Sequence, residues 1–309
     1  MRVSIRIAQR VSFRLLPKSR SAQVSNPVKR HLLGMQTNPA LQDVHTWGLR
    51  FTDAPNIGHV CSALLDGFRG KPSELPLVVT PNVDIMVTLE TAEASVKETV
   101  NRAAMVLPDG QPLVSLSRFA GGTLRARLPG SDLTAALWPE LINEQRSTFA
   151  IVPNVEVAER LAVQHPKFGS RVAPMVPAES GTLIDRFAWE CIEAMSAMEE
   201  TPEFVFLGIG FPKDPLLGRS IIEQWPAELG APPMVIAVGA SLEFITGLKK
   251  RAPEIFQRFG VEWVHRVVTE PRRMIKRYFI RDARFLLIVA RHAVRTPLAK
   301  AIRRRLSRR

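Results

Sequence analysis

The chain has 309 residues, of which 46% are hydrophobic, and its formal net charge is +13. This length can bury a sizeable core, in one large domain or two smaller ones. The longest wholly apolar run of the C-terminal third, Phe285–Ala290, is six residues long. A membrane-spanning helix needs about 20 such residues, so we expect no segment to cross a bilayer.

The positive charge lies at the two ends of the chain. Residues 247–309 hold 19 Lys or Arg against 4 Asp or Glu, and residues 1–30 hold eight basic residues and no acid. The stretch between them, 31–246, has 15 basic and 25 acidic residues. This pattern indicates an acidic core held against a polyanionic surface. We therefore predict a basic tail at 1–44, an α/β core at 45–246 and a basic helical appendage at 247–309.

The N-terminal tail is open to three interpretations. Arg2, Arg6, Arg10 and Arg14 recur every four residues between apolar residues. An amphipathic, acid-poor start is typical of an organellar transit peptide, and it would equally suit an interfacial helix on anionic lipid. The third interpretation is a disordered tail, or translated sequence upstream of the true start.

From residue 57 onward, short apolar runs alternate with helical patterns. The predicted strands are rich in Val and Ile, as buried parallel strands are: Leu75–Val79, Ala103–Leu107, Phe149–Val152, Phe204–Gly208 and Met234–Val238. The predicted helices are Ile57–Phe68, Ala92–Arg102, Leu133–Asn143, Val155–Gln164, Leu183–Met198 and Leu216–Leu229. This alternation predicts an α/β fold with a mainly parallel, Rossmann-like sheet and helices on both faces.

Ligands of such sheets bind at the carboxyl ends of the strands. Small, polar or turn-forming residues follow all five predicted strands: Thr80-Pro81-Asn82, Pro108-Asp109-Gly110, Pro153-Asn154, Gly210 to Asp214, and Gly239-Ala240-Ser241. Gly208-Ile209-Gly210 suggests close backbone approach to a nucleotide. This segment lacks the third glycine of the dinucleotide fingerprint, and Pro212 follows it closely in the sequence. Both features argue against an NAD site.

Asp109 is the principal candidate for catalysis. It directly follows an apolar strand, and Gly110 leaves its carboxylate open to a ligand. A partly desolvated carboxylate at the mouth of a cleft is suited to act as a general base. The alternative is an Asp-Gly turn whose side chain caps the next helix. Cys61 and Cys191 lie far apart among apolar neighbours, which predicts buried, reduced thiols in a cytosolic protein.

These motifs, in this order, resemble the WecG/TagA/CpsF glycosyltransferases over roughly residues 45–290. The landmarks are Thr80-Pro81-Asn82, Leu107 to Gly110, Arg127 to Asp132, Gly208 to Lys213, and a C-terminal series of Gly247, Lys250 to Pro253, Glu262-Trp263, Arg266, Glu270-Pro271, Arg273 and Arg277-Tyr278.

The resemblance implies an inverting enzyme that moves a sugar from a nucleotide donor, usually UDP-linked, to a polyprenyl-diphosphate-linked sugar of a bacterial surface polymer. It assigns the general base to Asp109 and places Thr80 and Asn82 in the same pocket. It also implies that the appendage brings Arg266, Arg273 and Lys276 to the leaving diphosphate. Our further candidates for substrate binding are Gly110, Arg127, Asp132, Gly208, Gly210, Pro212, Lys213, Asp214, Gly239 and Glu243.

No Asp-x-Asp motif occurs in the chain, so we expect neither a metal ion nor another cofactor. Arginines, backbone amides and helix N-termini can stabilise a diphosphate instead. Lys276 stands where arginine is usual in the family, which keeps the charge but loses the bidentate geometry.

The appendage also has helical patterning of its own. Met274, Ile275, Tyr278 and Phe279 form one face and basic residues the other, which is typical of a peripheral helix on an anionic membrane. A solvated charged face packed on the core is the alternative. Binding of nucleic acid is a weaker alternative, because the basic helices lack the interleaved aromatic residues on which single-stranded bases stack. We expect a cytoplasmic protein on the inner face of the cell membrane, and self-association into a homo-oligomer is left open.

Two loops depart from the family pattern. Where the family usually has Pro-Lys-Gln-Glu, this chain has Pro212-Lys213-Asp214-Pro215. Where the family usually has Phe-Asp, this chain has Leu242-Glu243. Both changes are expected to bring acid toward a diphosphate, where Lys213 or the appendage would have to offset it. A rival hypothesis is therefore a degenerate relative that binds nucleotide sugars or serves as a scaffold in a polysaccharide assembly complex.

Overall fold

The computed structural model describes residues 40–174, 181–249 and 283–295. Six parallel strands form the main sheet: β3 (Leu75–Val79), β4 (Ala103–Val106), β5 (Thr148–Val152), β6 (Phe168–Val172), β7 (Phe204–Leu207) and β8 (Met234–Ala237). Their spatial order is β4-β3-β8-β7-β5-β6. The last two strands in sequence, β7 and β8, therefore lie in the middle of the sheet.

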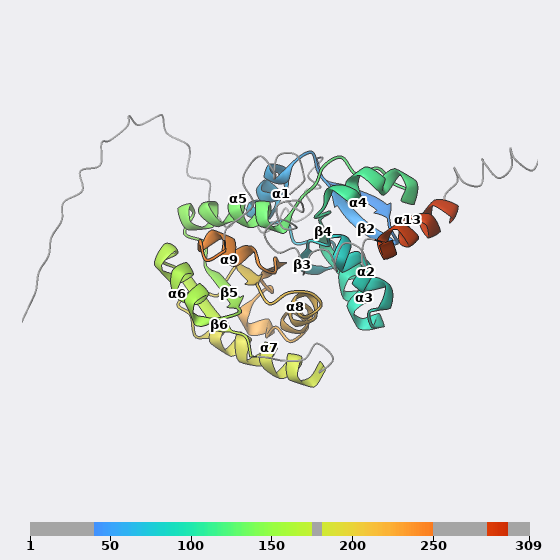
Figure 1. Ribbon diagram of the computed structural model, residues 1–309. Coiled ribbons are helices and arrows are strands. Elements are labelled where there is room, and N and C mark those ends of the chain that lie inside the picture. Colours follow the sequence, from blue (N-terminus) through green and yellow to red (C-terminus); the bar gives the residue numbers. More distant parts are fainter. Residues whose placement is uncertain (1–39, 175–180, 250–282, 296–309) are drawn as a thin grey trace, which may run out of the picture. The chain divides into compact units, whose positions relative to one another are not determined.

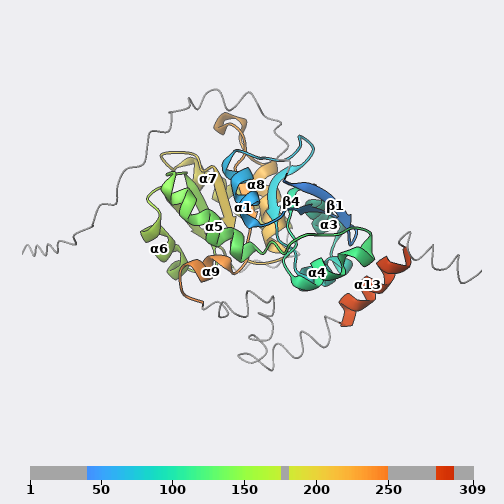
Figure 2. The ribbon, with the colours of Figure 1, turned by 90° about the horizontal axis from the view of Figure 1, so that it is seen from above.

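Helices cover both faces of this sheet (Figure 1). One face packs against α2 (Val83–Thr91), α3 (Ala94–Arg102), α7 (Gly181–Ser196) and α8 (Lys213–Glu223). The other packs against α1 (Ile57–Leu65), α5 (Gly130–Asn143), α6 (Val155–Gln164) and α9 (Ser241–Ile245). Figure 2 shows α5 between α1 and α6. The predicted α/β class is confirmed.

The strands supply both cores because their side chains alternate between the two faces. In β7, Val205 and Leu207 join one core cluster, while Phe204 and Phe206 join the other. All four side chains are fully buried. A strand buried on both faces needs apolar residues at every position, which is why the sequence shows continuous apolar runs here.

A small hairpin and three short helices lie outside the main sheet and the helices that cover it. Strands β1 (Gln42–Thr46) and β2 (Leu49–Asp53) pair antiparallel, separate from the main sheet. Between β4 and α5 lie α4 (Gln111–Leu116) and the 3-10 helix η2 (Ser117–Ala120), and η3 (Ala227–Leu229) precedes β8. The predicted helix Leu216–Leu229 is thus two helices, because α8 ends at Glu223.

Helix α13 (Ala283–Arg295) packs on the core through one stripe. Phe285 and Ile288 are buried, and the Phe285 ring lies 5.2 Å from the ring of Trp47. The helix contacts α2 and η2, and Arg291 pairs with Glu90 of α2 at 3.3 Å. Within the described residues, no helix is both long and apolar enough to span a membrane.

The predicted segment 1–44 lies almost entirely outside the described residues, as does most of the appendage. The division into three segments stays a prediction. Both cysteines are buried and free, as expected. Burial raises the pKa of the Cys61 thiol to about 11 and that of Cys191 to about 12, so neither side chain is a ready nucleophile near neutral pH.

Candidate active site

The predicted site residues of the core lie at the carboxyl ends of four neighbouring strands. Because the sheet order runs β4-β3-β8-β7, the loops that follow these strands stand next to one another at one edge. We call the loops after β3 and β4, with the first turn of α5, the Asp109 half of the edge. The loops after β7 and β8 form the Asp214 half.

In the Asp109 half, backbone hydrogen bonds join three segments of the chain. The Asp109 N–H donates to the Pro81 carbonyl at 3.0 Å, and the Leu128 N–H donates to the Pro108 carbonyl at 2.8 Å. Asp109 is half-buried. The loop after β4 is thereby fixed to the loop after β3 on one side and to the segment before α5 on the other.

Gly130 allows α5 to begin directly against Thr80. A Cβ atom at Gly130 would lie 2.7 Å from the Thr80 hydroxyl oxygen, closer than real Cβ atoms come. The first turn of α5 also carries Asp132, whose carboxylate lies 4.0 Å from the Arg127 guanidinium. Thr80, Asp109, Arg127 and Asp132 are therefore brought together. Gly130 was not among the predicted site residues, although the Pro-Gly-Ser start of a helix is a signal for such close approach.

Asn82 has a structural role in this half. Its side-chain oxygen accepts a hydrogen bond from the Ile85 N–H at 3.0 Å and so caps the N-terminus of α2. This is the usual geometry of an asparagine N-cap. The Thr80 hydroxyl donates to the Ala237 carbonyl of β8 at 3.4 Å and connects the two halves.

In the Asp214 half, a buried carboxylate joins the two loops. Asp214 is 3% exposed, and its oxygens accept hydrogen bonds from the N–H of Ile209 at 2.9 Å and of Gly239 at 3.2 Å. Burial raises the pKa of this carboxyl group to about 7, although the N–H donors and Lys213 act in the opposite direction. The carboxylate thus binds the protein's own backbone.

Glu243, the second acidic departure, also has a partner within the protein. Its carboxylate forms an ion pair with Lys249 at 2.6 Å, and its side chain is 17% exposed. Gly208, Gly210 and Pro212 belong to the same half, on the loop that leads into α8. Arg266, Arg273 and Lys276 lie outside the described residues, so their predicted role stays a prediction.

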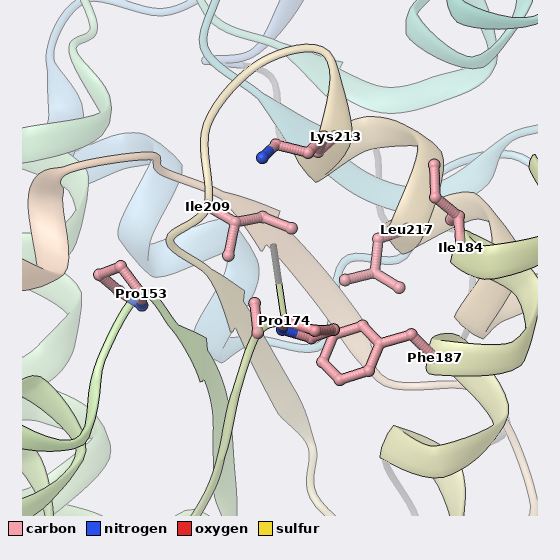
Figure 3. A pocket seen from close by; sticks show the side chains of 8 residues that line it. Pro153, Pro174, Ile184, Phe187, Ile209, Lys213 and Leu217 are labelled. Atoms are coloured by element: carbon pink, nitrogen blue, oxygen red, sulfur yellow. The ribbon is translucent and has the colours of Figure 1, made fainter. Parts of the chain in front are cut away.

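An apolar cavity of about 230 Å³ lies beside this half (Figure 3). Proline residues that follow β5 and β6 line it, together with Ile184 and Phe187 of α7, Ile209 and Leu217. Lys213 is the charged residue of the lining, and within the described chain its ammonium group makes no hydrogen bond or ion pair. This cation can therefore counter a negative charge on a ligand at the edge.

Comparison with known proteins shows the family of the chain. The model of the glycosyl transferase WecG/TagA/CpsF family matches residues 16–298. The chain belongs to this family. It is a glycosyltransferase by membership, and the resemblance inferred from the strand-end motifs is confirmed.

Relatives with named activities are N-acetylglucosaminyldiphosphoundecaprenol N-acetyl-beta-D-mannosaminyltransferases of Staphylococcus aureus. The protein of strain MRSA252 is 28% identical over 213 residues, which cover 67% of this chain and 77% of the relative. The protein of strain NCTC 8325 / PS 47 is 28% identical over 208 residues, with the same coverage.

Proposed function

We propose that this glycosyltransferase transfers a sugar, of the N-acetylhexosamine or uronic acid type, from a UDP-sugar to a polyprenyl-diphosphate-linked saccharide in bacterial surface polysaccharide synthesis. The observation that carries the proposal is the assembly of Thr80, Asp109, Arg127 and Asp132 at the carboxyl edge of a parallel sheet. The names of the staphylococcal relatives support the class of acceptor and of sugar.

In this mechanism Asp109 is the general base of an inverting transfer. Its carboxylate takes the proton of the acceptor hydroxyl as the hydroxyl oxygen attacks the anomeric carbon. The bond between that carbon and the donor diphosphate breaks at the same time, and the electron pair leaves with the nucleoside diphosphate. A single carboxylate suffices for inversion because no covalent intermediate forms.

The leaving diphosphate carries the charge that the enzyme must stabilise. Lys213, with no ion pair of its own in the described residues, is suited to this work from the Asp214 half. We propose that Arg266, Arg273 and Lys276 complete the cationic surroundings and that no metal ion takes part. Activity is then expected to survive an excess of EDTA, and its loss with recovery on adding a divalent ion would refute that point.

Helix α13 supports attachment to a lipid surface. With Phe285 and Ile288 buried, Leu286 and Leu287 are 62% and 61% exposed, and Arg291 is exposed as well. Exposed leucines beside basic residues suit a helix that lies in the membrane interface. Because α13 packs on α2 and η2, we propose that the Asp109 half faces a lipid-linked acceptor at the cytoplasmic side of the membrane.

The test is a transfer assay with the full-length protein. A panel of UDP-sugars is first screened for thermal stabilisation, since a ligand that binds the folded state shifts the unfolding equilibrium. The stabilising donor is then incubated with a polyprenyl-diphosphate-linked N-acetylglucosamine, and product is followed by mass spectrometry. Transfer with inversion supports the proposal. Measurable UDP binding without any transfer would instead favour a degenerate binding or scaffolding subunit.

A further inference from the structure

Asp214 stands where the family resemblance would place an amide, and its carboxylate lies inside the protein. We infer that Asp214 is a positioning residue: by accepting from both Ile209 and Gly239, it holds the loops after β7 and β8 in the spacing that receives the donor diphosphate. The inference rests on the proposed function, because it assigns the diphosphate to this half of the edge.

The hydrogen bonds of the Asp214 carboxylate brace two neighbouring loops, which means that they hold the loops in one relative position. Ile209 belongs to the loop after β7, and Gly239 belongs to the loop after the neighbouring strand β8. One carboxylate oxygen accepts from each. The Asp214 N–H also donates to the Gly210 carbonyl at 3.0 Å. The residue thus fixes both loops relative to each other and relative to the start of α8.

Asp214 makes the one side-chain hydrogen bond between these two loops in the described residues. The Gly239 N–H is shared with the Leu207 carbonyl of β7 at 3.2 Å, but that bond does not reach Ile209 or Gly210. The side chain of Ile209 is apolar, and Gly210 and Gly239 have no side chain that could make a hydrogen bond. Gly210 and Gly239 adopt positive φ values of 89° and 52°, and open space lies where their Cβ atoms would be. Such loops have many accessible conformations when unconstrained. A buried carboxylate that accepts a hydrogen bond from each loop restricts these conformations.

The braced loops carry N–H groups and a cation that can bind an oxyanion. The N–H groups of Phe211 and Ala240 make no hydrogen bond within the described part of the chain, and Lys213 is next to Asp214. N–H groups and a cation fixed before the ligand arrives bind an oxyanion without the cost of ordering them. Binding of a diphosphate should therefore depend on Asp214, although its carboxylate does not touch the ligand.

The experiment compares full-length wild type with Asp214→Asn, which keeps the shape but turns an N–H donor toward a backbone N–H. The dissociation constant of UDP is measured by calorimetry, and the exchange of the Ile209 and Gly239 amides is followed by mass spectrometry or NMR without ligand. We expect the dissociation constant of UDP to rise about tenfold, which corresponds to the loss of one hydrogen bond to a charged group. We also expect the Ile209 and Gly239 amides to exchange faster.

One control variant and the choice of conditions separate positioning from general loss of stability. Leu161→Ala removes a fully buried side chain of α6 in the opposite core, and all proteins are measured where each is fully folded. The Leu161→Ala variant should leave UDP affinity unchanged. Equal weakening in Leu161→Ala, or unchanged affinity in Asp214→Asn, would overturn the inference.

The outcome for the wild type keeps this inference distinct from the proposed function. If wild type bound no UDP or UDP-sugar, the proposed function and the diphosphate role would both fall, while the amide exchange would still show whether Asp214 braces the loops. If wild type bound UDP and transferred sugar but Asp214→Asn did so equally well, only the inference would be wrong.

Discussion

The two halves of the sheet edge each contain one prominent aspartate, and the two residues have opposite surroundings. Asp109 is half-buried, next to Thr80 and the first turn of α5. Asp214 is almost fully buried and accepts hydrogen bonds from two loops. A carboxylate near a strand end can therefore be half-buried at the edge of the sheet or buried against backbone N–H groups, and we propose a catalytic role for the half-buried one.

The largest effect is expected from Asp109→Asn, which tests the catalytic side of this comparison. An amide cannot take the acceptor proton, and a general base contributes on the order of a hundredfold to ten-thousandfold in rate. We expect kcat to fall about a thousandfold while UDP affinity and melting temperature stay near those of the wild type. Turnover close to the wild-type rate would remove Asp109 from the mechanism.

The proposed lipid contact of the Asp109 half is tested at the two exposed leucines of α13. The double variant Leu286→Asp and Leu287→Asp should lower the partition onto anionic vesicles by at least about a hundredfold, since each buried leucine contributes about 1.5–3 kcal/mol. Sedimentation with vesicles measures this. Val163→Asp, at a position of α6 that is 90% exposed, is the control and should bind as the wild type does. Equal binding by the double variant would contradict the contact.

The close approach of Gly130 to Thr80 can be examined with a double-mutant cycle. Gly130→Ala should cost about 1–3 kcal/mol of unfolding free energy, because the added methyl group overlaps the Thr80 side chain. In a Thr80→Ala background the same change should cost much less, since the overlapping atoms are gone. Denaturant unfolding measures all four proteins. Equal costs in both backgrounds would show that α5 moves away instead.

The smallest effect concerns pH and the buried Asp214. Its folded-state pKa of about 7 lies above the ordinary value of 3.8, so the stability that this group contributes is present at low pH and is lost as pH rises through about 7. The melting temperature of wild type relative to Asp214→Asn should therefore decrease between pH 5 and pH 8. UDP affinity relative to the same variant should increase over this range, because ionised Asp214 has two accepting oxygens. A difference that does not vary with pH would place the pKa of Asp214 outside the range.

Much of the fold could be predicted from the apolar runs. All five predicted strands exist, and Val155–Gln164 was predicted to the residue. Strand β6 was missed because its residues are half-buried or exposed, unlike those of β4 at the opposite edge, so Phe168-Gly-Ser-Arg-Val shows no apolar run. The hairpin β1–β2 was missed for a similar reason, since most of β1 faces solvent.

The sequence by itself determined the fold class, the strand-end motifs and, through their order, the family, because buried strands need continuous apolar residues and ligands bind where such strands end. Only the tertiary structure decided that Asp214 points inward, that Glu243 pairs with Lys249 and that Gly130 meets Thr80. The reason is physical. A residue type fixes which hydrogen bonds a side chain can make, whereas the strand order, unknown from sequence, fixes which partners stand within reach.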